Sequence, residues 1–80
     1  MWKKKESPER IEKRFELDSY QKTSEFMKVI DDLSKKFEIY PNVSFGKNFV
    51  SIVIFFNSEK ILDKENSFSI EIDNFYKLIK

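Results

Sequence analysis

The stretch VSFGKNFVSIVIFF, residues 43–56, determines which fold the rest of the chain can adopt. Two runs rich in β-branched and aromatic residues flank a short polar turn at residues 46–48, a pattern typical of a β-hairpin. Gly46 is the only glycine of the chain. A tight hairpin turn needs a residue with positive φ, and because glycine adopts positive φ without steric cost, we expect Gly46 to be that residue. The sequence therefore predicts an antiparallel pair of strands here.

The second strand of this hairpin is apolar on both faces. One face carries Val50, Ile52, Ile54 and Phe56, and the other carries Phe49, Ser51, Val53 and Phe55. A strand with one solvated face usually alternates apolar and polar residues, so both faces of this one are expected to be covered. Helices are expected on one face. The other is covered by a second chain or is an open face that tolerates apolar side chains, and the sequence favours neither.

Upstream of the hairpin, apolar residues recur three and four positions apart and predict a helix over residues 19–37. Asp18-Ser19 supplies a side-chain acceptor for the first turn, and Lys35 and Lys36 lie at the end where the helix dipole favours cations. Pro41 prevents continuation. The expected buried stripe consists of Thr23, Phe26, Ile30, Leu33 and Phe37.

The two ends of the chain complete a layered fold. Alternation at residues 11–17 predicts a strand, with Ile11, Phe15 and Leu17 facing inward. Residues 1–9 form an extended lead-in with solvated lysines at 3–5, in which Trp2 is expected to pack on the domain and a further strand is possible. A terminal helix capped by Asp63 carries the apolar stripe Phe68, Ile72, Phe75, Tyr76 and Ile79. The sequence predicts one domain over 1–80, an α+β two-layer sandwich with an antiparallel sheet of about four strands and two helices on one face.

Composition excludes most catalytic chemistries. The 80 residues include no His and no Cys, which removes thiol nucleophiles, Cys/His zinc sites and His-based triads. One glycine is too few for a phosphate-binding loop. The carboxylate pairs at 31–32 and 71/73 stand among lysines and are expected on solvated helix faces. We therefore expect no enzyme, no metal and no cofactor, and a fold stabilised by the nine phenylalanines.

The charge of the chain says little about its function. Fifteen basic and fourteen acidic residues leave a net charge of +1, without the basic surplus typical of a nucleic-acid-binding protein. The longest apolar run, 49–56, is too short to cross a bilayer. The lysines after Trp2 do not lead into the apolar stretch of a secretory leader. We expect a soluble cytoplasmic protein without nucleic-acid or membrane partners.

Several positions together resemble the pterin-4a-carbinolamine dehydratase family over about residues 11–78. They are Arg14-Phe15-Glu16-Leu17, Tyr20, Glu25-Phe26, Pro41, a strand starting near Val50, and Ile72-Asp73. The resemblance implies a β-β-α-β-β-α fold that pairs through its sheets as a homodimer. The two-sided apolar strand independently suggests a homodimer.

The family's catalytic histidines are missing here. Its His-His-Pro motif falls on Ile39-Tyr40-Pro41, its later His falls near Asn57, and an early acid of its last helix falls near Glu65 or Asn66. Dehydration requires proton transfer to a leaving hydroxyl, which Ile39 cannot perform and for which Tyr40 and Asn57 are poor substitutes near pH 7. The resemblance thus identifies vestigial pterin-site positions at Ile39, Tyr40, Pro41, Asn57 and Asn66, without dehydratase activity.

The segment Tyr40-Pro41-Asn42-Val43-Ser44-Phe45-Gly46 is similar to the Tyr-Pro-Asp-x-x-Phe-Gly pattern of a His-less branch of this superfamily, with Asn42 departing from it. That branch contains the Rubisco assembly factors associated with α-carboxysomes. The resemblance implies a chaperone that binds Rubisco large subunits in the cytoplasm or at the carboxysome. The candidate partner-binding residues are Tyr40, Pro41, Asn42, Ser44, Phe45, Asn48 and Phe49.

The sequence leaves other roles for Phe45 and Phe49, and other functions of the chain, open. Phe45 is expected to pack in the core, and Phe45 and Phe49 as a cross-strand pair would stabilise the hairpin rather than bind a partner. Other functions are a pterin dehydratase that uses non-His groups, or an interaction module for another partner, such as a transcription factor.

Overall fold

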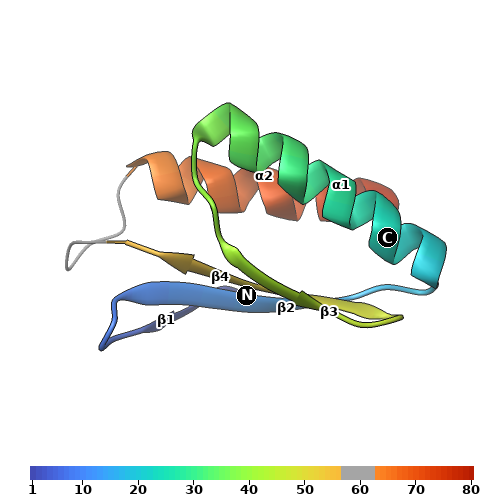
Figure 1. Cartoon of the computed structure of the whole chain (residues 1–80), viewed down its shortest axis with the longest axis horizontal. Helices are drawn as coiled ribbons and strands as arrows, with labels where there is room; N and C mark the ends of the chain where they lie inside the picture. Colours follow the sequence, from blue (N-terminus) through green and yellow to red (C-terminus); the bar gives the residue numbers. More distant parts are fainter. Residues whose placement is uncertain (57–62) are drawn as a thin grey trace.

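The structure, a computed structural model, describes residues 1–56 and 63–80. Within these residues the chain forms a four-stranded sheet with both helices on one of its faces (Figure 1). The elements in order are β1 (Lys3–Lys5), β2 (Arg10–Glu16), α1 (Tyr20–Phe37), β3 (Asn42–Phe45), β4 (Phe49–Phe55) and α2 (Asp63–Ile79). The predicted α+β sandwich is confirmed.

The sheet has the order β1-β2-β4-β3, and all neighbouring strands are antiparallel. The long strands β2 and β4 pair along their full lengths, from Arg10 opposite Phe55 to Glu16 opposite Phe49. The short strands β1 and β3 are the two edges of the sheet within the described residues. The face of the sheet that points away from the helices remains open in the single chain (Figure 1).

The core lies between the sheet and the helices. Its centre is the Phe15 ring, whose centroid lies 4.8 Å from the Tyr76 ring, 5.0 Å from the Phe26 ring and 5.8 Å from the Trp2 ring, in edge-to-face arrangements. The inward face of β4 is buried as predicted, with Val50, Ile52 and Ile54 completely inaccessible to solvent. The aromatic residues of this small chain therefore form much of its core.

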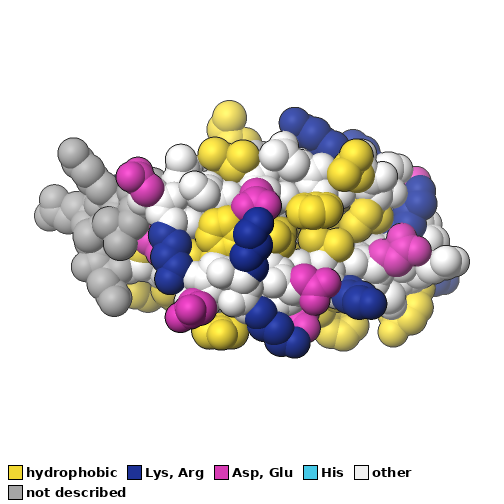
Figure 2. Space-filling view, turned by 90° about the horizontal axis from the view of Figure 1, so that it is seen from above, with side chains coloured by type: hydrophobic (Ala, Val, Ile, Leu, Met, Phe, Trp, Pro, Cys, Tyr) yellow, Lys and Arg dark blue, Asp and Glu magenta, His cyan; other side chains and the backbone are white. Residues whose placement is uncertain are grey.

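Helix α1 confirms the predicted boundaries to within one residue. The Ser19 hydroxyl accepts a hydrogen bond of 3.2 Å from the Lys22 N–H and so caps the first turn. At the other end Glu38 adopts the left-handed conformation, with φ of 55°, and its N–H bonds to the Ser34 carbonyl. Seen from the helix side, basic and acidic side chains are interspersed with apolar ones (Figure 2).

Residues 1–9 are not simply a lead-in, because Lys3–Lys5 form the edge strand β1, paired with Arg10–Glu12. Three consecutive lysines have low β propensity, so the strand depends on its ladder to β2 and on Trp2, which packs on the core as predicted.

The apolar stripe of α2 also differs from the prediction. Asp63 is the first described residue of α2, and its predicted capping role stays a prediction. Phe75 is 37% exposed and lies off the core stripe, whereas Tyr76 contacts the core.

Gly46 is required by a close approach rather than by its backbone angle. The structure contradicts the predicted positive φ. Instead, a Cβ atom at this position would lie 2.4 Å from Cε1 of the Phe49 ring, far inside van der Waals contact. The Phe49 ring in turn lies against the Arg14 guanidinium, 4.0 Å from its carbon.

Replacing Gly46 by alanine is therefore expected to lower the free energy of unfolding by about 1–2 kcal/mol, because the Phe49 ring must leave its place over Arg14. Urea unfolding followed by circular dichroism measures this change. Ser44→Ala, at an exposed position of the same hairpin, is the control and should be neutral. An unchanged stability of Gly46→Ala would show that the ring moves without cost.

Candidate partner-binding surface

A groove runs between α1 and the edge strand β3. Val43 and Phe45 point towards the helix layer, because they pair with Ile52 and Val50, whose side chains are buried there. Met27 of α1 faces them and lines two adjoining pockets. The first, of about 210 Å³, is also lined by Tyr40, Pro41 and Val43, and the second, of about 180 Å³, by Tyr20 and Phe45. We call these residues, Tyr20, Met27, Tyr40, Pro41, Val43 and Phe45, the α1–β3 groove.

The groove exposes three large aromatic side chains. Tyr40 is 73% exposed, Tyr20 57% and Phe45 55%. The expectation that Phe45 packs in the core is therefore wrong. Aromatic residues are enriched in protein interfaces, and tyrosine combines an apolar body with a polar tip. Their gathering along one groove is a feature suited to protein binding.

Hydrogen bonds hold the groove in shape. The Thr23 hydroxyl lies 2.8 Å from the Lys47 carbonyl and 3.0 Å from the Ser19 carbonyl, so the turn of the hairpin is fastened to the first turn of α1. The Leu17 N–H donates to the Asn48 carbonyl at 2.8 Å. These bonds fix the hairpin that carries Phe45 relative to the first turn of α1, which carries Tyr20.

The seven predicted partner-binding residues lie on two faces of the sheet. Tyr40, Pro41 and Phe45 line the groove. Asn42, Ser44 and Phe49 alternate with the inward residues of β3 and β4 and so lie on the open face, and Asn48 lies in the exposed turn. The register places Val50 opposite Phe45, so Phe45 and Phe49 are not directly opposed across the strands.

Sequence reasoning did not include Tyr20 and Met27 in this surface. Tyr20, Ser24, Met27 and Asp31 recur at helical spacing beside the core stripe of α1. That second stripe is the signal that could have found them. Only the fold shows that it lies next to β3.

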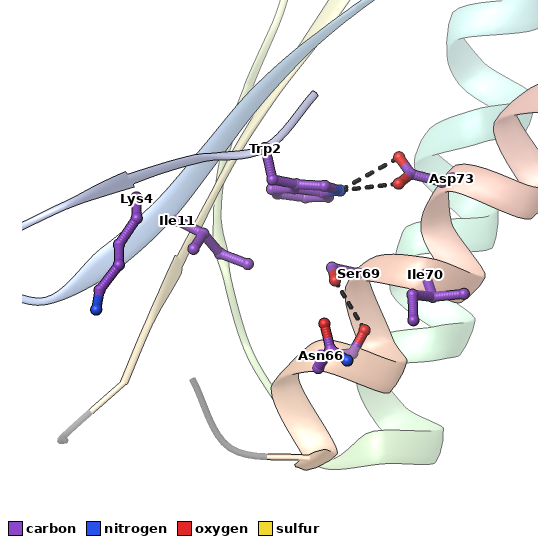
Figure 3. A pocket seen from close by; sticks show the side chains of 7 residues that line it. All are labelled: Trp2, Lys4, Ile11, Asn66, Ser69, Ile70 and Asp73. Carbon is purple, nitrogen blue, oxygen red and sulfur yellow. Dashed lines mark hydrogen bonds between the residues drawn. The ribbon is translucent and has the colours of Figure 1, made fainter. Parts of the chain in front are cut away.

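The vestigial pterin-site positions do not share one pocket among the described residues. Ile39 packs against the core, whereas Tyr40 and Pro41 line the groove. Asn66 lines a different pocket of about 580 Å³ between β1 and α2 (Figure 3). Asn57 lies outside the described residues. Glu65, next to Asn66, is 9% exposed, and its Oε1 has no hydrogen-bond partner within the described part of the chain.

Asp73 has a structural role that the sequence did not reveal. The Trp2 indole N–H points at its carboxylate, 3.2 and 3.1 Å from the two oxygens (Figure 3), and the Lys13 ammonium lies 2.8 Å from Oδ1. We call Trp2, Lys13 and Asp73 the clasp. The expectation that Asp73 is merely solvated is wrong, because its carboxylate accepts hydrogen bonds from Trp2 and Lys13. These partners lie 71 and 60 positions away in the chain, so the sequence did not reveal them.

Among residues 1–56 and 63–80, no group of three or more His, Cys, Asp or Glu side chains is placed to hold a metal ion. Neither of the two helices in the same ranges is long and apolar enough to cross a membrane.

Known proteins show to which class this fold belongs. No protein-family model matches the sequence, and no curated protein matches it. Solved structures do match, and they define the class: the chain has the pterin dehydratase-like α+β fold, as the resemblance predicted.

Within this class, the chain is similar to a pterin dehydratase-like protein identified as a RuBisCO assembly factor in the α-carboxysome. The identity is 26%, the TM-score is 0.83, and the match covers 94% of this chain and 88% of the other. A transcriptional coactivator/pterin dehydratase from Brucella melitensis matches with 18% identity and a TM-score of 0.67, over 98% of this chain and 80% of the other, and supports the fold alone.

Proposed function

We propose that this protein is a non-catalytic assembly chaperone that binds the Rubisco large subunit through the α1–β3 groove. The observation that carries the proposal is the groove itself, in which Tyr20, Tyr40 and Phe45 are exposed and a hydrogen bond joins the hairpin turn to α1. The likeness to a RuBisCO assembly factor supports the choice of partner. The expected location, the cytoplasm or the α-carboxysome, follows from that partner.

The groove suits reversible binding. Fully burying one large side chain contributes about 1.5–3 kcal/mol, and because these three are only 55–73% exposed, they together contribute roughly 3–6 kcal/mol before the cost of association. The net affinity is therefore modest. A chaperone of this kind shields an apolar subunit surface and leaves when the permanent partner arrives.

Native mass spectrometry and calorimetry with purified Rubisco large subunits test this proposal. We expect binding at micromolar concentrations, weakened about ten-fold or more by Phe45→Ser or Tyr40→Ser, because each removes an exposed aromatic anchor. The control is Phe75→Ser, which removes a partly exposed phenylalanine from α2, outside the groove. The lack of any binding by the wild-type chain, or equal loss in the control, would falsify the proposal.

Pterin dehydration is the competing function, and the same sample can be assayed for it. We expect no turnover, because Ile39 offers no proton-transfer group and because Tyr40 and Asn66 line separate pockets. Turnover above background that disappears in Tyr40→Phe would instead identify an enzyme that uses the Tyr40 hydroxyl.

We further propose that the protein is a homodimer paired through the open face of the sheet. Phe55 is 44% exposed there, and Phe49 and Val53 are half-buried. The ion pairs Arg10–Glu12 (2.6 Å) and Arg14–Glu16 (2.8 Å) place positive and negative charges on this face. Hydrogen bonds from Arg10 and, to a smaller extent, from Lys5 lower the pKa of Glu12. A surface with both charges and apolar residues can match its own two-fold copy.

Sedimentation velocity tests the homodimer. We expect a dimer that Phe55→Asp converts to a monomer, because the change removes the most exposed apolar side chain of this face and would bury a charge between the two sheets. Leu78→Asp, on the outer side of α2, should leave the dimer intact. A monomeric wild-type chain at all concentrations would contradict this assignment.

A further inference from the structure

We propose that the α1–β3 groove binds an extended segment of the partner, which adds to the sheet as a strand beside β3. This inference rests on the proposed function, in which the groove is the partner-binding surface. It specifies the chemistry of the segment: an acidic, an apolar, a second apolar and a basic residue in that order, each separated from the next by one residue of any kind, so that all four side chains lie on the same face of the added strand.

The backbone of β3 is arranged for such an addition. The Gly46 N–H donates to the Phe49 carbonyl at 3.1 Å, so this pair is a hydrogen-bonded pair of the β3–β4 ladder. Hydrogen-bonded and non-bonded pairs alternate along an antiparallel ladder. Phe45 and Val43, opposite Val50 and Ile52, are therefore non-bonded pairs, and their N–H and C=O groups point away from β4. No strand among the described residues pairs with that edge.

The side chains of an added strand would enter the two pockets of the groove. Residues that hydrogen-bond to Val43 and Phe45 stand directly opposite them, with side chains on the same face, towards α1. Two such residues are two positions apart, a spacing of about 7 Å. The pockets of about 210 and 180 Å³ adjoin through Met27 and lie at the Val43 and Phe45 positions. Each pocket can receive one apolar side chain of moderate size.

The charges at the two ends of the groove set the polarity of the segment. Asp31 lines the pocket at the Tyr40 end, and its carboxylate is exposed although Lys35 lies 3.0 Å away. Lys47 is exposed at the other end, after Phe45. An antiparallel addition, like every other pairing in this sheet, runs from the Lys47 end to the Asp31 end. Charge complementarity therefore places the acidic residue first and the basic residue last, each two positions from the nearest apolar residue, so that its side chain also faces α1.

A short synthetic peptide tests the proposal on the full chain. The probe is the acetylated and amidated nonapeptide Thr-Asp-Thr-Val-Thr-Val-Thr-Lys-Thr, titrated by calorimetry and by backbone NMR. The matched control has the same composition with adjacent valines, Thr-Asp-Thr-Val-Val-Thr-Thr-Lys-Thr, and should bind about ten-fold more weakly, because one valine then faces away from α1. Exchanging the aspartate and the lysine of the probe should also weaken binding.

Methylation of single amides separates strand addition from simple apolar contact. N-methylation of both valines removes the donors that face β3 and should reduce binding about ten-fold or more. N-methylation of the central threonine, whose N–H points away from β3, should leave binding unchanged. Phe45→Ser in the protein should weaken peptide binding, and Phe75→Ser should not. Equal binding of the two valine arrangements, or of the two methylated peptides, would overturn the inference.

Competition with Rubisco large subunits distinguishes this inference from the proposed function. If the subunits bind in a Phe45-dependent way while the peptide neither binds nor competes, the strand addition is wrong and the chaperone function stands. If the peptide binds but the subunits do not, the chaperone function fails while the groove keeps its assigned chemistry. A dimer that persists in Phe55→Asp and excludes the peptide would place a second copy on β3 and overturn the inference.

Discussion

Replacing Phe15 by alanine is expected to lower the free energy of unfolding by about 4 kcal/mol, through lost burial and the cavity left behind. The Phe15 side chain is 1% exposed, and its ring is the common neighbour of the Trp2, Phe26 and Tyr76 rings. A domain of this size has a total stability of only about 4–12 kcal/mol. The substitution should therefore remove about a third to all of that stability.

Urea unfolding followed by far-UV circular dichroism measures this loss, with Trp2, the single tryptophan of the chain, as a fluorescent probe of the same transition. Phe75→Ala is the matched control, because that ring is 37% exposed and lies outside the Phe15 cluster, so it should cost about 1 kcal/mol or less. If both variants lost the same stability, the core would not be centred on Phe15.

Replacing Asp73 by alanine is expected to cost about 2 kcal/mol, because the change removes two charge-assisted hydrogen bonds of the clasp at once. The Trp2 N–H and the Lys13 ammonium would both lose their carboxylate partner. The Lys13 and Asp73 side chains are 19% and 28% exposed, so water replaces the lost bonds only in part.

A double-mutant cycle separates the Trp2 contribution from the rest. Trp2→Phe keeps an aromatic ring beside Phe15 but removes the N–H, and its effect should be smaller in the Asp73→Ala background than in the wild-type chain by about 1 kcal/mol. Asp73→Asn, which keeps an acceptor oxygen, should be milder than Asp73→Ala. Additive effects of Trp2→Phe and Asp73→Ala would mean that the indole hydrogen bond does not stabilise the fold.

Periodicity in the sequence was sufficient for most of the fold. The helical spacing and the Ser19 cap predicted α1 to within one residue, and alternation predicted that Ile11 and Phe15 of β2 face inward. The sequence offered a further strand near Trp2 only as an alternative, because Lys3–Lys5 carry no apolar pattern and strand β1 is held by partners elsewhere in the chain. The reason for Gly46 was also wrong, since a glycine at a turn is compatible with a positive φ and with a close approach alike.

The candidate surface was less accessible to sequence reasoning than the fold. The Tyr40–Gly46 motif drew attention to the right segment, but alternate residues of a strand lie on opposite faces, so a contiguous motif does not form a contiguous surface. Tyr40 and Phe45 lie in the groove, whereas Asn42 and Ser44 do not. Met27 could be joined to them only once the packing of α1 beside β3 was known.

The two edges of the sheet differ in a way that limits aggregation. Within the described residues, one edge is β1, made only of lysines, and the other is β3, made of Asn, Val, Ser and Phe. Lysines on an edge strand discourage pairing with another strand, because their charges repel and are costly to desolvate. A fibre that grows strand by strand needs two receptive edges, and this sheet offers one. Strand pairing at β3 therefore ends after a single addition instead of propagating into a polymer.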